Sequence, residues 1–457
     1  MTTGNHLADP AATALSACLS GQVLRPGNDD FALELDGFNL ITEHDPQLIA
    51  VVDDAADVRH AVAFAADHGF PVAVQATGHG PSTAASGGLL VSTRRLRGVM
   101  VHPAARTARV EAGTRWYEVI HAAAEFGLAP LSGSSPLVGV AGYTLGGGLG
   151  LMARRYGYAA DLVTALEVVT ADGQFRRVTA DRDAELFWAL RGGKGNFGVV
   201  TALEFDLVPV GRLFGGGLFF PGESAGEVLH AWRAWTEGVP DEMTSSLALL
   251  RLPDVETVPG FLRGRLTAHL RIAYLGPAES GDRLIAPLRE AAPLIVDTVG
   301  EMPYTRCGEI HNDPCEPIPY NERSMMLREL DDAGADMLLK LAGPGADCID
   351  MVVELRHLGG ATGRPPAVPS AVDHRDAAFA LSTVSLPDGR PPLVVDAMAP
   401  WGTGLRFLNF LASPDTAGLA RSGYAPDTWA RLRAVKARVD PDNLFRFNHN
   451  IPPAPAT

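Results

Sequence analysis

Cysteine is scarce in this sequence, and it has neither long apolar runs nor an excess of basic residues. Four cysteines among 457 residues are too few for a disulfide scaffold. No window resembles an 18-residue membrane span, and a net charge of −15 argues against nucleic acid as a partner. The first twenty residues lack a basic stretch followed by an apolar core, so we expect no secretory signal, no membrane association and a cytoplasmic location.

Two of the cysteines flank a histidine in "CGEIHNDPC", residues 307–315. A metal site would need a fourth ligand and tighter spacing than Cys307, His311 and Cys315 provide. We therefore expect free thiols and no metal.

The hydrophobic and charged fractions, 46% and 20%, are typical of a soluble globular enzyme, and the chain is long enough for more than one core. From about residue 47 to 210, short β-branched runs alternate with alanine-rich helical patterns. Residues 55–69 predict a helix ending at a glycine. Residues 98–114 predict a hairpin, and residues 162–180 predict two strands around an Asp-Gly turn. This alternation indicates an α+β domain.

From about residue 211 to 405 the pattern changes to alternating strands and amphipathic helices. The expected strands are 244–253, 264–276, 348–360 and 379–387, and the expected helices are 223–239 and 280–292. We expect an antiparallel sheet covered by helices on one face, with the other face free to cover a bound cofactor. Residues 426–453 predict a helix and an extended segment, and the proline-rich residues 451–457 predict a loose terminus.

Two glycine-rich loops about sixty residues apart carry the clearest chemical signal: "ATGHGPS" (76–82) and "SGSSPLVGVAGYTLGGGLG" (132–150). Glycines let backbone N–H groups approach a phosphate closely, so the pair predicts a nucleotide-type cofactor, whereas either loop alone could be a tight turn. "GGGLG" lacks the strand context and acidic ribose partner of a dinucleotide fingerprint. "GGKGNFG" (192–198) lacks the Lys-Ser or Lys-Thr pair of an ATP-binding loop.

His79 lies between glycines in the first loop, and the residues leave three roles open for it. It could be an exposed loop residue, a general base, or a nucleophile that binds the cofactor covalently. A neutral imidazole nitrogen is nucleophilic near pH 7, and glycine neighbours remove steric hindrance.

Several ordered motifs between about residues 40 and 452 resemble the berberine bridge enzyme-like family of FAD-linked oxidoreductases, which has the vanillyl-alcohol oxidase (PCMH-type FAD-binding) fold. The motifs are "TGHG" (77–80), "SSPLVGVAGYTLGGGLG" (134–150), "YGYAADLVTALEVVTADG" (156–173), "LFWALRGGKGNFGVVTALEF" (186–205), "LRHLGGA" (355–361), "DHR" (373–375), "RFLNF" (406–410) and "DPDNLFRFNHNIPP" (440–453). His79 matches the family histidine that carries an 8α-linked flavin. The resemblance implies FAD contacts from Gln75, Ala76, Thr77, Gly78, His79, Gly80, Pro81, Ser82, Ser135, Val138, Gly139, Gly142, Thr144, Gly147, Gly148, Asn196, Gly198, Val200 and Asn448.

Four positions bear on how far the family chemistry carries over. Ser135 stands where many members have a cysteine that forms a second flavin link, so a single link through His79 is expected. Phe407, in Phe407-Leu408-Asn409, replaces the tyrosine that serves as a base in several relatives. Leu149 replaces a tyrosine of "GGGYG". Val138 occupies the position of the family's oxygen gate and resembles the oxygen-permissive members.

Because Phe407 cannot accept a proton, the base must be another group, water, or none if the substrate is already acidic. Candidates are Glu354, Tyr304, His374 and Tyr424, with Arg356 beside Glu354. Each also has a structural interpretation: Glu354 and Arg356 alternate with apolar neighbours, as on a solvent-facing strand edge. Tyr304 and His374 fit packing roles, and Tyr424 could form a hydrogen bond across the domain junction.

The sequence therefore predicts an FAD-binding domain at 30–210, a substrate-binding domain at 211–410, and a C-terminal segment, 411–457, that returns to the first domain. The expected activity is FAD-dependent oxidation of a small organic molecule, such as a secondary metabolite, with hydride transfer to the flavin and reoxidation by O2. Two alternatives stay open: a dehydrogenase with another acceptor, and a flavin-binding protein with cyclase-like, non-redox turnover or none.

Overall fold

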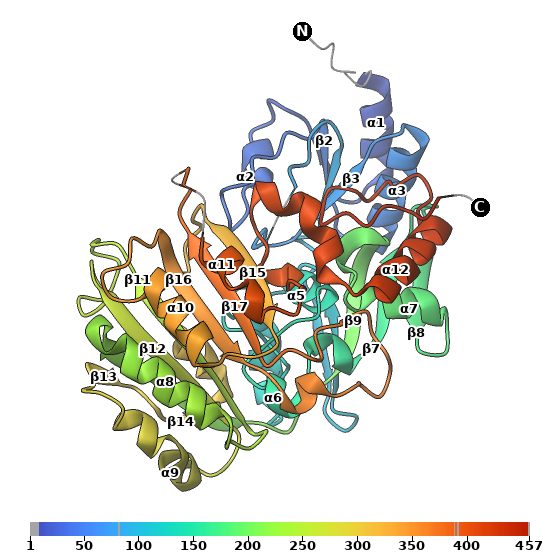
Figure 1. Ribbon diagram of the computed structural model, residues 1–457. Helices are drawn as coiled ribbons and strands as arrows, with labels where there is room; N and C mark the ends of the chain where they lie inside the picture. Colours follow the sequence, from blue (N-terminus) through green and yellow to red (C-terminus); the bar gives the residue numbers. More distant parts are fainter. Residues whose placement is uncertain (1–8, 81–82, 388, 391–392, 456–457) are drawn as a thin grey trace.

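Three β-sheets, each with its own helices, make up the computed structural model, which describes residues 9–80, 83–387, 389–390 and 393–455 (Figure 1). None of the helices in these residues is long and apolar enough to cross a membrane.

The first sheet has the order β1-β2-β4-β3, with β1 (Gln22–Leu24) antiparallel to β2 (Leu48–Val51), and β3 (Val72–Gln75) and β4 (Leu89–Ser92) parallel to their neighbours. Helix α3 (Ala55–Asp67) connects β2 to β3. Its first turn is capped by Asp54, which accepts hydrogen bonds from the N–H groups of Ala56 and Asp57. The helix ends before Gly69, as predicted, because φ there is +67°.

The second sheet is antiparallel, in the order β5-β6-β9-β7-β8. Its strands are β5 (Val99–His102), β6 (Thr107–Glu111), β7 (Val163–Val169), β8 (Phe175–Thr179) and β9 (Val199–Asp206). Both predicted hairpins are confirmed, and Gly173 takes the positive φ of +70° that the turn between β7 and β8 requires. This sheet and the first one pack around one continuous apolar core. The helices of this half are α1 (Asp9–Cys18), α2 (Phe31–Leu35), α4 (Trp116–Ala124), α5 (Val140–Leu145), α6 (Ala153–Tyr156) and α7 (Ala184–Leu190).

The third sheet has eight antiparallel strands, with the central order β10-β12-β11-β16-β17-β15. Its strands are β10 (Arg212–Pro221), β11 (Met243–Arg251), β12 (Leu266–Tyr274), β13 (Val296–Asp297), β14 (Gly300–Pro303), β15 (Asn321–Leu327), β16 (Asp350–His357) and β17 (Phe379–Ser385). Helices α8 (Ala225–Thr236), α9 (Ala278–Arg289) and α10 (Asp332–Ala342) lie on one face, so the predicted one-sided covering is confirmed (Figure 1). The short α11 (Val394–Ala397) packs against β17.

Sequence patterns missed β10, β15 and α10. Strand β10 contains the run Gly215 to Gly217, which interrupts any apolar alternation, yet its backbone pairs with β12 on one side and with β13 and β14 on the other. Strand β15 is polar in its first half and buried in its second, so its sequence does not show the alternation typical of a strand. Backbone pairing with β17 places it in the sheet.

The C-terminal helix α12 (Pro426–Val439) packs against α7, and the segment after it is more ordered than predicted. Ile451 is fully buried, and its N–H donates to Asn196 Oδ1. The N–H of Ala454 donates to the carbonyl of Arg433, whose guanidinium in turn donates to the carbonyls of Pro452 and Pro453. The prediction of a loose terminus is therefore wrong for residues 451–454, because side chains far along the chain satisfy this backbone.

Candidate functional site

The two glycine-rich loops lie against each other, although about sixty residues separate them. The first follows β3, and the second surrounds α5. Thr77 joins them: its Oγ1 accepts a hydrogen bond from the N–H of Gly139 at 3.3 Å and lies 2.8 Å from His79 Nδ1. One threonine hydroxyl thus fixes both the loop contact and one side of the His79 ring.

His79 is held as a neutral, oriented imidazole. Its ring stacks on Phe38, with centroids 4.1 Å apart and planes 6° from parallel, and its carbonyl accepts a hydrogen bond from the hydroxyl of Tyr320. Burial, and then the nearby Arg115, lower the pKa of His79 to about 4. The Nε2 atom is buried and has no hydrogen-bond partner among the residues that the structure describes. A neutral ring with one free, buried nitrogen is suited to act as a nucleophile.

Glycine is required in the first loop because the backbone passes another segment closely. Gly78 has φ +66°, and a Cβ there would lie 2.4 Å from the Cα of Gly37. Ala76 and Gly80 belong to the same loop, whereas the predicted contacts Pro81 and Ser82 lie outside the described residues. Gln75, at the end of β3, donates from its amide to the carbonyls of Glu34 and Leu35, a structural role.

The second loop leaves space on one side of α5 and is crowded on the other. A Cβ on the exposed Gly142 would meet no atom within 4 Å, whereas one on Gly148 would lie 2.5 Å from the Tyr143 ring. Thr144 Oγ1 and the Tyr143 hydroxyl are buried, and neither has a hydrogen-bond partner in the described part of the chain. Ser135 and Val138 are half-buried just before α5, and Gly147 follows α5 with φ +106°.

A third segment, residues 192–198, meets the C-terminal tail. The amide of Asn196 donates to the carbonyls of Gly193 and His449, and that of Asn448 donates to the carbonyl of Gly195. The Asn448 Oδ1 atom is buried and unpartnered within the described residues. Beyond this segment, Gly198 has φ +150° and Val200 belongs to β9.

Across from the loops, the third sheet carries a buried charged cluster formed by Arg271, Glu354, Arg356, Ser246 and His311. Glu354 Oε1 accepts hydrogen bonds from Arg271 Nη1 at 2.6 Å and from the Ser246 hydroxyl at 2.7 Å. Its Oε2 accepts from Arg356 Nε at 3.0 Å, and Arg356 Nη2 lies 2.9 Å away. The His311 Nε2 atom lies 3.3 Å from Glu354 Oε1.

The solvent-facing interpretation of the β16 strand is therefore wrong. The Glu354 side chain is 5% exposed and that of Arg356 is 15% exposed. Strand register explains this: Arg271 and Arg356 both pair with Ser246, so all three point to the same face. Glu354, two residues from Arg356, shares that face, which is opposite the helices.

The cluster fixes the charge of its two titratable members. Burial opposes ionisation of Glu354, but Arg356 and Arg271 outweigh it and hold the pKa of the carboxyl well below its usual range. Burial lowers the pKa of His311, and Arg271 adds to the effect. At neutral pH the carboxylate is charged and the imidazole is neutral.

The other base candidates form hydrogen bonds or ring contacts outside this cluster. The Tyr304 hydroxyl bonds to Ser132 and to the carbonyl of Pro130, and that of Tyr424 donates to the carbonyl of Gly192. Burial raises the pKa of both tyrosines. His374 is buried edge-on against Phe407, and burial followed by Arg375 lowers its pKa to about 4.

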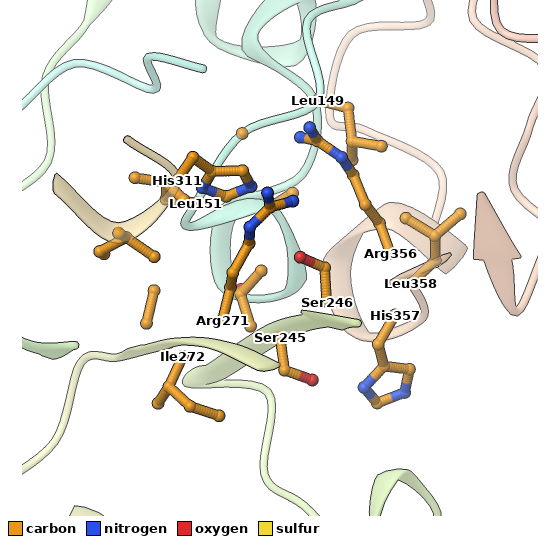
Figure 2. A pocket seen from close by; sticks show the side chains of 15 residues that line it. Leu149, Leu151, Ser245, Ser246, Arg271, Ile272, His311, Arg356, His357 and Leu358 are labelled. Atoms are coloured by element: carbon orange, nitrogen blue, oxygen red, sulfur yellow. The ribbon is translucent and has the colours of Figure 1, made fainter. Parts of the chain in front are cut away.

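A small cavity of about 20 Å³ separates the cluster from the second loop. Leu149 and Leu151 face it from the loop side, while Arg271 and Arg356 point into it with His311 alongside (Figure 2). This enclosed part holds about one water molecule, whereas the empty space between the lining residues, including the part open to solvent, is about 370 Å³. Its walls combine apolar side chains with charged donors.

Among the residues that the structure describes, those around His311 do not form a metal site. Cys307 is buried, and burial raises the pKa of its thiol to about 12, whereas Cys315 is exposed. The four cysteines are unpaired. In the described part of the chain, no three His, Cys, Asp or Glu side chains group so that they could hold a metal ion.

Sequence analysis missed three side chains of the site, Arg271, Tyr320 and Lys194, and considered His311 only as a metal ligand. The first had a signal, because two polar residues two positions apart, His269 and Arg271, interrupt the apolar β12. Lys194 is buried and donates to the carbonyl of Leu408 and to Asn409 Oδ1, and burial lowers its pKa to about 8. These contacts join distant segments, so spacing alone could not reveal them.

Comparison with known proteins gives two family matches. Residues 46–179 match the model described as FAD binding domain, and residues 424–452 match the one described as berberine and berberine like. The first match covers both glycine-rich loops, and the second covers the C-terminal segment that meets Asn196.

Similar proteins span nearly the whole chain. (R)-6-Hydroxynicotine oxidase of Paenarthrobacter nicotinovorans is 29% identical, covering 97% of this chain and 98% of its own. The crystal structure of 6-hydroxy-D-nicotine oxidase from Arthrobacter nicotinovorans has a TM-score of 0.81 at 26% identity, covering 95% of this chain and 98% of its own. The BBE-like 1 protein of Physcomitrella patens shares the fold, with a TM-score of 0.84 at 20% identity over 97% of this chain and 100% of its own.

Proposed function

Because the chain belongs to the berberine bridge enzyme-like family of FAD-linked oxidoreductases, we propose that it is an FAD-dependent oxidase of a small organic molecule, with one covalent flavin link through His79. The observation that carries this proposal is the geometry of His79. Its ring is neutral, it is fixed by Thr77 and Phe38, and its Nε2 atom is buried without a partner among the described residues.

The residues around His79 fit FAD. Buried polar atoms that lack a partner in the described chain occur on both sides of the loop contact, and the open flank of Gly142 leaves room for a planar group. The residues that would hold FAD are Ala76, Thr77, Gly78, His79, Gly80, Gly139, Gly142, Thr144, Gly147, Gly148, Asn196, Gly198, Val200 and Asn448. Ser135 has a hydroxyl where a second link would need a thiolate, which supports a single link.

FAD, when bound, supplies a hydride acceptor and passes two electrons to a second acceptor. We take O2 as that second acceptor, because Val138 resembles the oxygen-permissive residue at this position in the family. Leu149 and Leu151 line the cavity with apolar side chains on the loop side, while the charged cluster faces the same cavity from the sheet.

Proton removal from the substrate falls to His311 in this proposal. Phe407 has no titratable group, and Glu354 is a weak base because two arginines stabilise its charged form. His311 is neutral and lines the cavity, and neither of its ring nitrogens has a hydrogen bond to another described residue. Its Nδ1 can accept the substrate proton, while the Glu354 carboxylate 3.3 Å from Nε2 stabilises the resulting imidazolium.

Replacing His311 with glutamine is expected to lower kcat by about 10²- to 10⁴-fold while the flavin content stays unchanged. The lowered His311 pKa places the acid limb of the wild-type kcat/KM profile below the ordinary imidazole pKa of about 6.5, because protonation removes the base as pH falls. The glutamine variant should lack this limb. The measurement is the pH dependence of flavin reduction by the first alcohol or amine that bleaches the wild-type protein. An unchanged profile in the variant would assign the proton to another group.

The oxidase proposal is tested without knowing the substrate. The purified protein is photoreduced under anaerobic conditions and then mixed with air-saturated buffer, and flavin absorbance and H2O2 are followed. Return of the oxidised spectrum within seconds, with stoichiometric H2O2, is expected of an oxidase. A flavin that stays reduced for minutes in air but responds to an artificial dye would indicate a dehydrogenase. A protein without flavin would contradict both.

A further inference from the structure

We propose that the substrate oxidised at this site carries a carboxylate, and that Arg271 and Arg356 bind it. The inference rests on the proposed function, since it concerns the substrate that the cavity beside the flavin loops admits. It goes further by naming the charged group that this cavity recognises.

The first observation is that each guanidinium has one uncommitted terminal nitrogen. Arg271 uses Nε on His269 Nδ1 and Nη1 on Glu354, while Arg356 uses Nε and Nη2 on Glu354. Neither Arg271 Nη2 nor Arg356 Nη1 has a hydrogen-bond partner among the described residues. Both side chains point into the same cavity (Figure 2). Two neighbouring donors on rigid, planar groups match the two oxygens of a carboxylate.

The second observation is that two guanidiniums share one carboxylate. Arg271, Arg356 and Glu354 together carry one net positive charge with side chains 6%, 15% and 5% exposed. Burial raises the pKa of the neighbouring Glu322 to about 8, so it is largely protonated at neutral pH and offsets little of this charge. The half-buried Asp313 also acts on Arg356, but it does not line the cavity. A buried excess charge is costly unless a counter-ion joins it, and a monoanion is the matching counter-ion.

The third observation concerns the fixed position of the donors. Arg356 lies over the Phe410 ring, with its guanidinium carbon 4.8 Å from the ring centroid. Arg271 lies two strands away on β12, with Ser246 of β11 between the two arginines. The adjoining walls include Leu149, Leu151 and Ile272. A small planar anion on an apolar body suits such walls better than a bulky, strongly hydrated phosphate does. His311 lies beside the same donors, so a carboxylate there places the adjacent carbon near the proposed base.

The test compares acids with their isosteric amides on the flavin-loaded wild-type protein. The probes are phenylacetate against phenylacetamide and 4-hydroxybenzoate against 4-hydroxybenzamide, with Kd measured by isothermal titration calorimetry at pH 7. We expect the acid of at least one pair to bind ten- to a hundredfold more tightly than its amide. Acids that bind no more tightly than the amides, or no binding by either member of both pairs, would overturn the proposal.

Variants locate the anion. Arg356→Gln and Arg271→Gln should each remove at least nine-tenths of the preference for the acid while leaving amide binding within about twofold. The matched control Arg283→Gln removes an exposed arginine of α9 that pairs with Glu279, and it should keep the preference. If either glutamine variant fails to fold, Arg356→Lys is used instead. It keeps the positive charge but loses the planar pair of N–H donors, so it should lose most of the preference for the acid. A preference that survives in every folded variant would overturn the assignment to these arginines.

The same samples separate this inference from the proposed function. Flavin content and reoxidation in air are recorded on each preparation before titration. Selective acid binding by a protein whose flavin stays reduced in air would contradict the oxidase proposal alone. Rapid reoxidation without acid selectivity would contradict the carboxylate proposal alone.

Discussion

Replacing His79 with alanine is expected to turn a flavin that stays with the polypeptide in acid into one that is released completely. The wild-type linkage is covalent in our proposal, so unfolding the protein does not free it. His79 is a neutral imidazole beside the loop contact, and alanine has no atom that could replace its buried Nε2. The measurement is flavin absorbance in the pellet and supernatant after precipitation in trichloroacetic acid, with in-gel fluorescence of the polypeptide as a second readout.

The control is His68→Ala, which removes an exposed histidine at the end of α3 and should leave all flavin in the pellet. Flavin released from the wild-type protein would show that His79 is not a linkage site, although the family assignment would stand. Flavin retained by the alanine variant would place the link on another side chain.

Replacing Asp440 with alanine is expected to lower the free energy of unfolding by about 3–5 kcal/mol, because it leaves a buried lysine without its counter-charge. Asp440 and Lys436 have fully buried side chains and are 2.6 Å apart. The carboxylate also accepts the N–H groups of Leu444 and Phe445, so two backbone donors lose their partner as well. The measurement is equilibrium denaturation in urea, followed by tryptophan fluorescence.

Asp442→Ala is the matched control, since Asp442 is exposed two residues away and should change stability by less than about 0.5 kcal/mol. The Asp440 variant should also bind less flavin. Lys436 donates to the carbonyl of Asn196 and so connects the C-terminal segment to residues 192–198. A change in unfolding free energy below about 1 kcal/mol would mean that water or another group compensates the lysine.

Elements with strong local signals were predictable. The helix at α3 has both a capping aspartate and a terminal glycine, and the β7–β8 hairpin has its Asp-Gly turn. Strand β10 was not predictable, because its glycines conceal a buried strand whose backbone groups are satisfied by β12 and β14. The C-terminal tail was predicted to be loose from its proline-rich composition. Its order comes from hydrogen bonds of the tail backbone to Asn196 and Arg433, which the composition of the tail cannot reveal.

The amino-acid sequence by itself predicted two glycine-rich loops for a nucleotide-type cofactor and singled out His79 between the glycines of the first. Glycines that permit positive φ and close backbone contact act over a few residues, so they are visible in a short stretch such as 76–80. Only the tertiary structure brought together the charged cluster that faces these loops. Arg271, Ser246 and Arg356 meet because three strands align in register, and Glu354 shares their face. His311 joins them from a separate loop. Buried charges are tolerated only where opposite charges converge from separate segments, so folding, which brings those segments together, creates this half of the site.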